Sequence, residues 1–535
     1  NFICNYGDWI AMAIHEGELM KYNPGTNQLV KIDIPEANHT FVRNVACFDN
    51  ELWVGTHEGL FVVNERKNKI VHLKQDLMRP FSLSDKIIYT IYRDREGGIW
   101  LGTMFGGVDY LPHHDLLFDK YVPGSDGNSL TTKRVREIAS DNKSNIWIGT
   151  EDDGVNILNI ASGKVRRLRL NDYDKGNYMV TLGMFVKGSQ LFCGLFKQGL
   201  DVIQLPENKV CHYTPEELNI GEGSVYTFFI DNEGYKWIGT GWGLYKAAPT
   251  SFHFDKVEEV GFDWIFDVFQ DKDGMMWFAS MGSGLWKYDP HKNLFKKYTH
   301  EEGKENTLSS NSVSSVMQDC KGRIWISTDR GGICCYNSQT DDFTTFSIKD
   351  GLPDDVAYKI LEDEQSNLWF GTNRGLVRFN PESKDIRVYT TKDGLLGNQF
   401  NYKSALKGED GKFYFGGIDG LIAFDPNSSE KINFLPPVYI SKFSIYNQEI
   451  TVHTPNSPLK KCIEHTDEII LPYDQANISF DVALLSYSTT ESNQYYYKLV
   501  PLDKDWIRAA SNQNISYAKL PPGDYILQVR AINSA

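Results

Sequence analysis

The sequence has few cysteines, and they are not arranged for a disulfide framework or a metal site. Its 535 residues contain eight cysteines, scattered from Cys4 to Cys462, and no CxxC pair. A chain that can bury large cores has little need of disulfides, so we expect buried free thiols. We also find no run of about 18 apolar residues to span a membrane and no signal peptide after Asn1.

Motifs for catalysis and cofactor binding are missing as well. There is no phosphate-binding glycine loop, no nucleophile elbow and no zinc-ligand spacing, and no pair of carboxylates stands out for acid–base chemistry. An Asp-x-x-Gly-x-x-Trp turn is similar to the Asp boxes of sialidases, but their arginine triad and tyrosine nucleophile cannot be identified. The sequence therefore predicts no catalytic residue, no bound metal and no cofactor.

The balance of charge argues against two classes of partner. The chain has 55 basic and 70 acidic residues, which gives a net charge of −15. The long-range field of such a surface repels nucleic acid and anionic lipid. A local basic patch can still bind a small anion.

A short repeat dominates what is present. One copy runs from Asp141 to Gly154: an acidic residue opens a polar turn, an apolar strand with Trp147 ends in Gly-Thr, and a second turn ends in Gly. The aromatic residue of this unit recurs at positions 9, 53, 100, 147, 192, 237, 277, 325, 369 and 414, at intervals of 40 to 48 residues. Such a period, with four short strands per unit, is typical of β-propeller blades.

The repeat around Trp325 illustrates the expected blade. Val313 begins an inner strand, residues 323–328 form the second strand, 333–336 the third and 343–346 the fourth. Asp319 is expected to cap the first turn with its carboxylate, and glycine supplies the positive φ of the turns. The tryptophan is most simply a packing wedge between neighbouring blades.

Ten repeats exceed one ordinary propeller, and residues 117–121 suggest how they divide. These residues read as a spare outer strand, while the last repeat lacks a convincing fourth strand. Pairing the two would close a ring of seven blades and hide its open edges. We therefore predict an all-β protein: the last blades of a truncated propeller (1–113), a complete seven-bladed propeller (114–432) and a third domain (433–535).

The period stops after Pro437. Residues 438–445, 469–471, 478–483, 495–499 and 525–529 alternate like strands of a sandwich. This pattern predicts a small immunoglobulin-like β-sandwich that lacks its last strand.

These features resemble those of one family. The copies Asp94–Thr103 and Asp141–Gly154 resemble two-component regulator propeller repeats, and Asp393–Asn401 resembles the start of the family's last blade. Residues 497–506 and 517–525, with Tyr497, Tyr517 and Tyr525, resemble the triple-tyrosine (Y_Y_Y) domain that follows. The resemblance covers essentially the whole chain in the family's order. It implies the periplasmic sensor region of a hybrid two-component system.

The resemblance also implies a setting for the chain. The full protein would have a signal sequence, two seven-bladed propellers and the Y_Y_Y domain. A membrane helix, histidine kinase, receiver and DNA-binding module would follow. This chain lacks about four N-terminal blades of that pattern, and both of its ends look cut.

The turns after each Gly-Thr are the candidate ligand site. Topology places them around one mouth of the ring, with the loops that join the blades, and the Asp-x-x-Gly turns on the other face. They vary between repeats, as binding residues on a scaffold do. The candidates are Asp153, Phe196, Lys197, Trp242, Asp329, Arg330, Asn373, Arg374 and Asp419. A tryptophan can stack on a sugar ring, and Arg or Lys suits a carboxylate or sulfate. The alternative is that they are ordinary solvated loop residues.

We therefore expect a ligand-sensing region without enzymatic activity of its own. An oligosaccharide would bind at a mouth or groove, and a homodimer would relay binding through the Y_Y_Y domain to a membrane helix and a kinase. No nucleic acid is expected to bind this region. Two other hypotheses remain open: a periplasmic propeller enzyme, such as a polysaccharide lyase or glycosidase, and a protein-binding scaffold.

Overall fold

The computed structural model divides into two compact units. One unit combines residues 1–77, 81–115 and 430–535, and the other contains residues 78–80 and 116–429. The structure describes residues 2–14, 18–34, 40–76, 81–112, 118–124, 128–141, 143–168, 180–205, 207, 209–221, 223–428, 435–487, 494–509 and 514–532. The predicted domain boundaries at 113/114 and 432/433 lie outside these residues and stay predictions.

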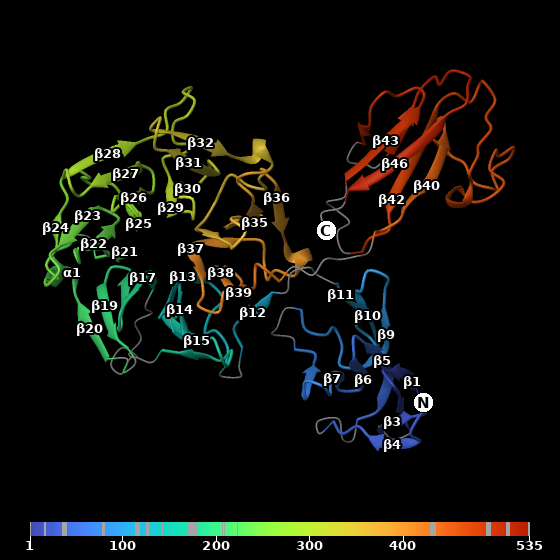
Figure 1. Cartoon of the computed structure of the whole chain (residues 1–535), viewed down its shortest axis with the longest axis horizontal. Helices are drawn as coiled ribbons and strands as arrows, with labels where there is room; N and C mark the ends of the chain where they lie inside the picture. The colour runs from blue at the N-terminus through green and yellow to red at the C-terminus, as the bar shows by residue number, and fades with distance from the viewer. Residues whose placement is uncertain are drawn as a thin grey trace. The chain divides into compact units, whose positions relative to one another are not determined.

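The second unit is a ring of seven four-stranded blades (Figure 1). The first blade contains β13 (Val135–Ser140), β14 (Asn145–Thr150), β15 (Val155–Asn159) and β16 (Val165–Arg167). The second contains β17 (Thr181–Lys187), β18 (Gln190–Leu195), β19 (Gly199–Gln204) and β20 (Lys209–Tyr213), and the third β21 (Val225–Ile230), β22 (Lys236–Thr240), β23 (Gly243–Ala247) and β24 (Asp255–Lys256). The fourth contains β25 (Ile265–Gln270), β26 (Met276–Ser280), β27 (Gly284–Asp289) and β28 (Leu294–Tyr298). The fifth contains β29 (Val313–Gln318), β30 (Ile324–Thr328), β31 (Ile333–Asn337) and β32 (Asp342–Phe346), and the sixth β33 (Ile360–Glu362), β34 (Leu368–Thr372), β35 (Gly375–Phe379) and β36 (Ile386–Tyr389).

The seventh blade is completed by a strand from the other end of the ring. Its strands β37 (Phe400–Lys407), β38 (Phe413–Gly417) and β39 (Leu421–Phe424) come from the C-terminal side. The fourth strand is β12 (Asp119–Tyr121), which pairs antiparallel with β39 from Asp119 opposite Ala423 to Tyr121 opposite Leu421. The predicted closure of the ring is confirmed.

In five repeats a hydrogen-bonded turn ties an aspartate to the tryptophan of the same blade. In the fifth blade, Oδ1 of Asp319 accepts from the backbone N–H groups of Lys321 (3.0 Å) and Arg323 (2.8 Å). Its Oδ2 accepts from the indole Nε1–H of Trp325 at 2.9 Å. The same three bonds recur for the pairs Asp94–Trp100, Asp231–Trp237, Asp271–Trp277 and Asp363–Trp369. The turn and the wedge are therefore one unit.

The polar group of the wedge residue is treated differently in the seventh and first blades. In the seventh blade the hydroxyl of Tyr414 donates to Asp410 Oδ2 at 2.8 Å, so a tyrosine serves in place of the tryptophan. In the first blade Asp141 accepts from Asn145 at both oxygens, and the indole Nε1–H of Trp147 has no partner. The wedge role is thus shared by repeats whose polar contacts differ.

The wedges pack between neighbouring blades, as predicted. Trp237 of the third blade shares a hydrophobic cluster with Ile265 and Phe278 of the fourth, and Trp277 shares one with Val316 and Ile326 of the fifth. Trp237, Trp277, Trp325 and Trp369 are each only 1% exposed. Each tryptophan thus buries a large apolar area at a junction between two sheets.

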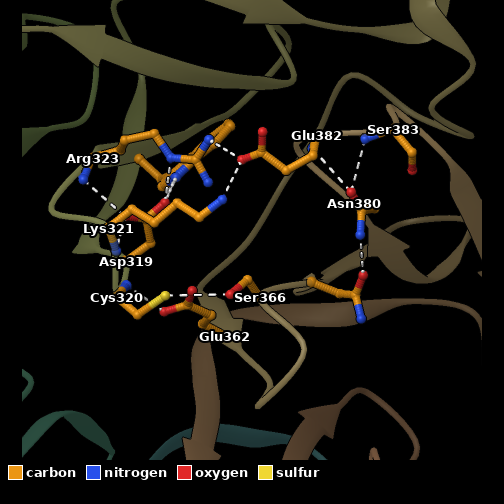
Figure 2. A network of polar contacts seen from close by, with 11 residues as sticks. Asp319, Cys320, Lys321, Arg323, Glu362, Ser366, Asn380, Glu382 and Ser383 are labelled. Carbon is orange, nitrogen blue, oxygen red and sulfur yellow. Dashed lines mark hydrogen bonds and ion pairs between the residues drawn. The ribbon is translucent and has the colours of Figure 1, made fainter.

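Polar contacts lock neighbouring blades on the face that carries the Asp turns. Figure 2 shows Lys321 Nζ and Arg323 Nη1 of the fifth blade on Glu382 Oε1 of the sixth, at 2.7 Å and 3.0 Å. The backbone N–H of Cys320 donates to Glu362 Oε2 at 2.7 Å, and Cys320 Sγ lies 3.3 Å from Ser366 Oγ. The charged side chains of these turns therefore serve blade–blade contacts.

The first unit contains three propeller repeats and a β-sandwich. Two repeats have four strands each: β1 (Phe2–Tyr6) to β4 (Gln28–Lys31), with β2 (Trp9–Ala13) and β3 (Leu19–Asn23), and β5 (Val42–Phe48) to β8 (Lys69–Leu73), with β6 (Glu51–Thr56) and β7 (Gly59–Asn64). The third has β9 (Ile88–Arg93), β10 (Ile99–Thr103) and β11 (Val108–Leu111). The predicted partial propeller is confirmed.

The sandwich consists of two sheets around a core that contains Phe443, Val482 and Ile515. One sheet has the order β41-β40-β42-β45 and the other β44-β43-β46. Their strands are β40 (Val438–Ile445), β41 (Gln448–Glu449), β42 (Ile478–Leu484), β43 (Gln494–Val500), β44 (Ile507–Arg508), β45 (Asn514–Tyr517) and β46 (Ile526–Ile532). Tyr497 and Tyr517 pack against this core with their rings 5.9 Å apart.

Two local predictions are wrong. Residues 469–471 form no strand: Ile470 is 77% exposed, and Pro472 cannot donate to a ladder. The cysteines are free, but Cys211, Cys320 and Cys462 are exposed rather than buried. These three side chains lie outside the hydrophobic cores.

No helix among the described residues has the length and apolar character to cross a membrane.

Exchange of one oxygen tests the turn–wedge bond. We expect Asp271→Asn to lower the free energy of unfolding by about 1–3 kcal/mol, because its amide cannot accept from both the backbone and Trp277 Nε1–H. The matched control is Asp273→Asn, an exposed position in the same turn. Urea denaturation measures both; equal losses in the two variants would contradict the role of this bond.

Candidate functional site

The first strands of the blades carry extra residues at one end of the ring. The register between first and second strands shifts once in each of the first five blades, and one residue is left unpaired each time. These residues are Arg136, Leu182, Tyr226, Phe266 and Ser314. In the seventh blade the shift covers Asn401–Ser404. A bulge re-aims side chains and interrupts pairing, so these residues can differ without disturbing the sheets.

Aromatic side chains from these positions meet around the axis of the ring. Phe266 of the fourth blade lies 5.5 Å, ring to ring, from Tyr402 of the seventh, although these blades are not neighbours. Tyr402 is also 4.9 Å from Tyr358 of the sixth blade, and Phe266 is 6.2 Å from Tyr226 of the third. Four blades therefore contribute to one aromatic cluster, which we call the central cluster: Tyr226, Phe266, Tyr358 and Tyr402.

Charged side chains lie against the central cluster. Lys403 Nζ is 3.1 Å from Glu137 Oε2, and both side chains are 5% exposed. The same ammonium donates to the backbone oxygen of Tyr226 and lies 5.2 Å from the centre of the Phe266 ring. Arg136 Nη1 is 2.9 Å from Glu151 Oε1. The centre of the ring thus combines aromatic faces with paired charges.

Asp267 is a carboxyl group of this region with a raised pKa. Burial raises the pKa of its carboxyl to about 6, although Lys403 and Lys359 nearby favour the charged form. Glu137 acts in the same direction as burial. A carboxyl in this position changes charge within the ordinary range of environmental pH.

The third and fourth blades carry exposed aromatic residues, of which Trp264 contacts the cluster. Trp264 is 37% exposed and its ring lies 5.0 Å from that of Tyr226. Phe262 and Trp242 are 73% and 61% exposed. Trp242 precedes Gly243, where a Cβ atom would come within 2.6 Å of the Gly261 oxygen, so the two loops run in contact.

The structure brings several of the predicted site residues to the central cluster. The hydroxyl of Tyr358 donates to Asn373 Oδ1 at 2.7 Å. Burial raises the pKa of Tyr402, with Asp329 adding to the rise and Arg330 opposing it, so both charges act at this tyrosine. Phe196 and Lys197 lie together on the second blade, with the Lys197 ammonium 5.2 Å from the ring centre.

Other predicted residues lie elsewhere. Asp153 pairs with Arg167 of the outer strand β16 at 2.6 Å, and Asp419 lies 3.5 Å from Lys133. The backbone N–H groups of Trp242 and Arg374 donate to the threonine hydroxyl of their own turn. Among the described residues, no side-chain contact joins either of them to the central cluster. The predicted set is therefore several groups along one face.

Sequence reasoning missed the central cluster itself. It considered the turns after Gly-Thr and treated the first strands as uniform scaffold. A signal was available: Arg136, Tyr226, Phe266, Ser314 and Tyr358 each stand 11 residues before the tryptophan of their blade, and this position varies between a charged, a small polar and aromatic residues. Variation at one fixed position of a repeat marks a place where the scaffold does not dictate the side chain.

Among the described residues, no group of three His, Cys, Asp or Glu side chains is arranged to hold a metal ion.

Comparison with known families matches two parts of the chain. The two component regulator propeller family matches residues 82–105 and 351–374, and the Y_Y_Y domain family matches residues 486–535. The chain carries two-component regulator propeller repeats and a Y_Y_Y domain. The repeat at Asp94–Thr103 and the order of repeats before the triple-tyrosine domain were predicted from the sequence and are confirmed.

Relatives agree with this assignment. Histidine kinase P4 of Formosa agariphila is 27% identical over 316 residues, which are 50% of this chain and 23% of that protein. The chain thus spans about a quarter of the curated relative that it matches. The extracellular domain of the hybrid two component system BT3049 from B. thetaiotaomicron has the same fold, with a TM-score of 0.78 at 23% identity, over 99% of this chain and 70% of that chain.

Asp267 gives the site a testable pH dependence. Its folded pKa of about 6 lies above the value of about 3.9 in an unfolded chain, so the folded state binds this proton more tightly. Its contribution to stability is therefore fully present below about pH 4 and is lost as pH rises through 6.

We expect Asp267→Asn to be more stable than the parent at pH 8, by on the order of 2 kcal/mol, and equal to it near pH 4. Urea denaturation across this pH range measures the difference. Glu233→Gln, at an exposed turn, is the control and should follow the parent at every pH. A constant difference between Asp267→Asn and the parent would refute the assignment.

Proposed function

We propose that this chain is the extracytoplasmic, ligand-sensing region of a hybrid two-component system and that it binds an oligosaccharide at the central cluster. The observation that supports this most is the meeting of aromatic and charged side chains from several blades at one end of a closed ring. A mouth of this kind collects many different side chains on a rigid scaffold, as binding sites require.

The chemistry of the side chains around the central cluster favours a sugar. Aromatic faces such as that of Trp264 offer flat apolar area for the C–H face of a pyranose ring. Asn373, Asp329 and Arg330 offer donors and acceptors for hydroxyl groups. The turns that carry these groups are held by a rigid ring. The conformational entropy lost on binding is therefore small.

Signalling requires a second step. Ligand binding shifts a sensor only if its affinity differs between two arrangements of the molecule. We propose that two copies of the chain form a homodimer in the periplasm, and that the Y_Y_Y domains relay a change in their packing to a membrane helix and a histidine kinase. The family matches and the kinase relative support the two-component part of this proposal.

A binding assay tests the function directly. Calorimetry or an array would present the folded protein with oligosaccharide fragments of neutral and acidic polysaccharides. Binding without turnover is expected. Release of smaller products would point instead to a lyase or glycosidase, and a stable complex with a periplasmic protein, without glycan binding, to a protein-binding scaffold.

One substitution locates the site. We expect Trp264→Ala to weaken binding of the identified glycan at least tenfold, since loss of about 1.4 kcal/mol of stacking costs a factor of ten. Trp506→Ala is the matched control, because that tryptophan is equally exposed (37%) but belongs to the sandwich. Equal affinities of the two variants would place the glycan elsewhere.

A further inference from the structure

The rim of the fifth blade contains a hollow. Its volume is about 460 Å³, within the range of roughly 300–1,000 Å³ typical of small-molecule sites. It lies between the connection that follows β28 and the outer strand β32. The buried side chains of Leu308 and Phe343 contribute to its lining, and around them stand the polar groups of Thr307, Ser309, Thr345, Ser347, Lys349 and Asp355.

The wall of this hollow is anchored by the chain itself. The backbone N–H of Phe343 donates to the Asn306 oxygen at 2.9 Å, which ties the connection to the outer strand. The backbone N–H of His300 donates to Asn311 Oδ1 at 2.7 Å, and that of Glu301 to Thr307 Oγ1 at 3.3 Å. The hollow therefore exists before any ligand arrives, which reduces the cost of binding.

The lining suits a neutral molecule rich in hydroxyl groups. Two carboxylates (Glu305 and Asp355) balance two ammonium groups (Lys304 and Lys349), so the charges of the side chains cancel. Asp355 uses Oδ1 to accept from Ile348 N–H at 2.8 Å, and among the described residues no donor reaches its Oδ2. Among the described residues, Lys349 has no ion-pair partner. A hydroxyl group of a ligand can donate to Asp355 Oδ2 and accept from the Lys349 ammonium.

The hollow and the central cluster are joined by a short piece of chain. Asp355 lines the hollow and Tyr358 belongs to the cluster, and three residue steps span at most about 11 Å. Gly331, which also lines the hollow, directly follows Arg330. Both sites thus open on the face of the ring that carries the turns after Gly-Thr.

We propose that the hollow is a second subsite, which holds another unit of the sugar chain whose first unit lies on the central cluster. This inference rests on the proposed function, because it assigns the length of the ligand for the same face. The ligand is then an oligosaccharide of several units with an uncharged unit over the fifth blade.

The sixth blade supplies a matched control position. Ser347–Asp350 and Thr390–Asp393 form the same capped turn: each hydroxyl accepts from the lysine N–H two residues on, and each aspartate accepts from the first residue's N–H. Lys349 and Lys392 occupy equivalent places, but only Lys349 lines the hollow. Lys392 has an interaction of its own, so the stability of both variants is measured beside binding, and only substitution of Lys349 should weaken ligand binding.

The test uses calorimetry with size-defined ladders of neutral oligosaccharides, from monosaccharide to hexasaccharide. In the parent, we expect affinity to rise with chain length. In Lys349→Ala, we expect the affinity for long chains to fall roughly tenfold and that for short chains to stay unchanged. Lys392→Ala should bind like the parent. Lys349→Glu provides a second variant at this exposed position.

The outcomes separate the two proposals. If Trp264→Ala removes binding but affinity does not grow with length, or if Lys349→Ala binds long chains like the parent, the second subsite is refuted and the central site remains. If no chain of any length, neutral or acidic, binds to the folded parent, both proposals are refuted.

Discussion

The hydrogen bond between a turn aspartate and the indole of the next tryptophan organises the propellers. One carboxylate closes the turn with Oδ1 and holds the wedge with Oδ2, so the shape of the turn and the orientation of the tryptophan are set together. Burial alone would raise the pKa of Asp319, but the bonds from Trp325 and Arg323 hold it below its usual value. A charged acceptor of this kind is a strong partner inside a protein.

Because of this constraint, the two faces of the complete ring have different roles. The face of the Asp turns uses its charged side chains to join blades, as the contacts of Glu382 with Lys321 and Arg323 illustrate (Figure 2). The opposite face carries loops and bulge residues that take no part in the contact between the turn and the tryptophan. Chemical variety is therefore possible there, and the central cluster and the hollow of the fifth blade both lie on that side.

The candidate site was predicted in part. Asn373, Asp329 and Arg330 were identified as variable loop residues, and the structure places them near Tyr358 and Tyr402. The tyrosines themselves were not identified, because a strand pattern alone does not reveal that a bulge turns one residue toward the axis. Asp153, another predicted site residue, pairs with Arg167 of an outer strand, and its part in binding stays a prediction. Contacts between side chains from distant repeats cannot be read from spacing.

The sequence by itself determined the blade, the number of blades in the ring and the strand that closes it. These follow from local rules: a periodic aromatic residue, turn residues at constant offsets, and an unpaired strand that needs an edge. Only the tertiary structure decided which side chains meet. Phe266 and Tyr402 are 136 positions apart in the sequence and touch because seven similar sheets close around one axis. That closure is a property of the whole ring, and no single repeat contains it.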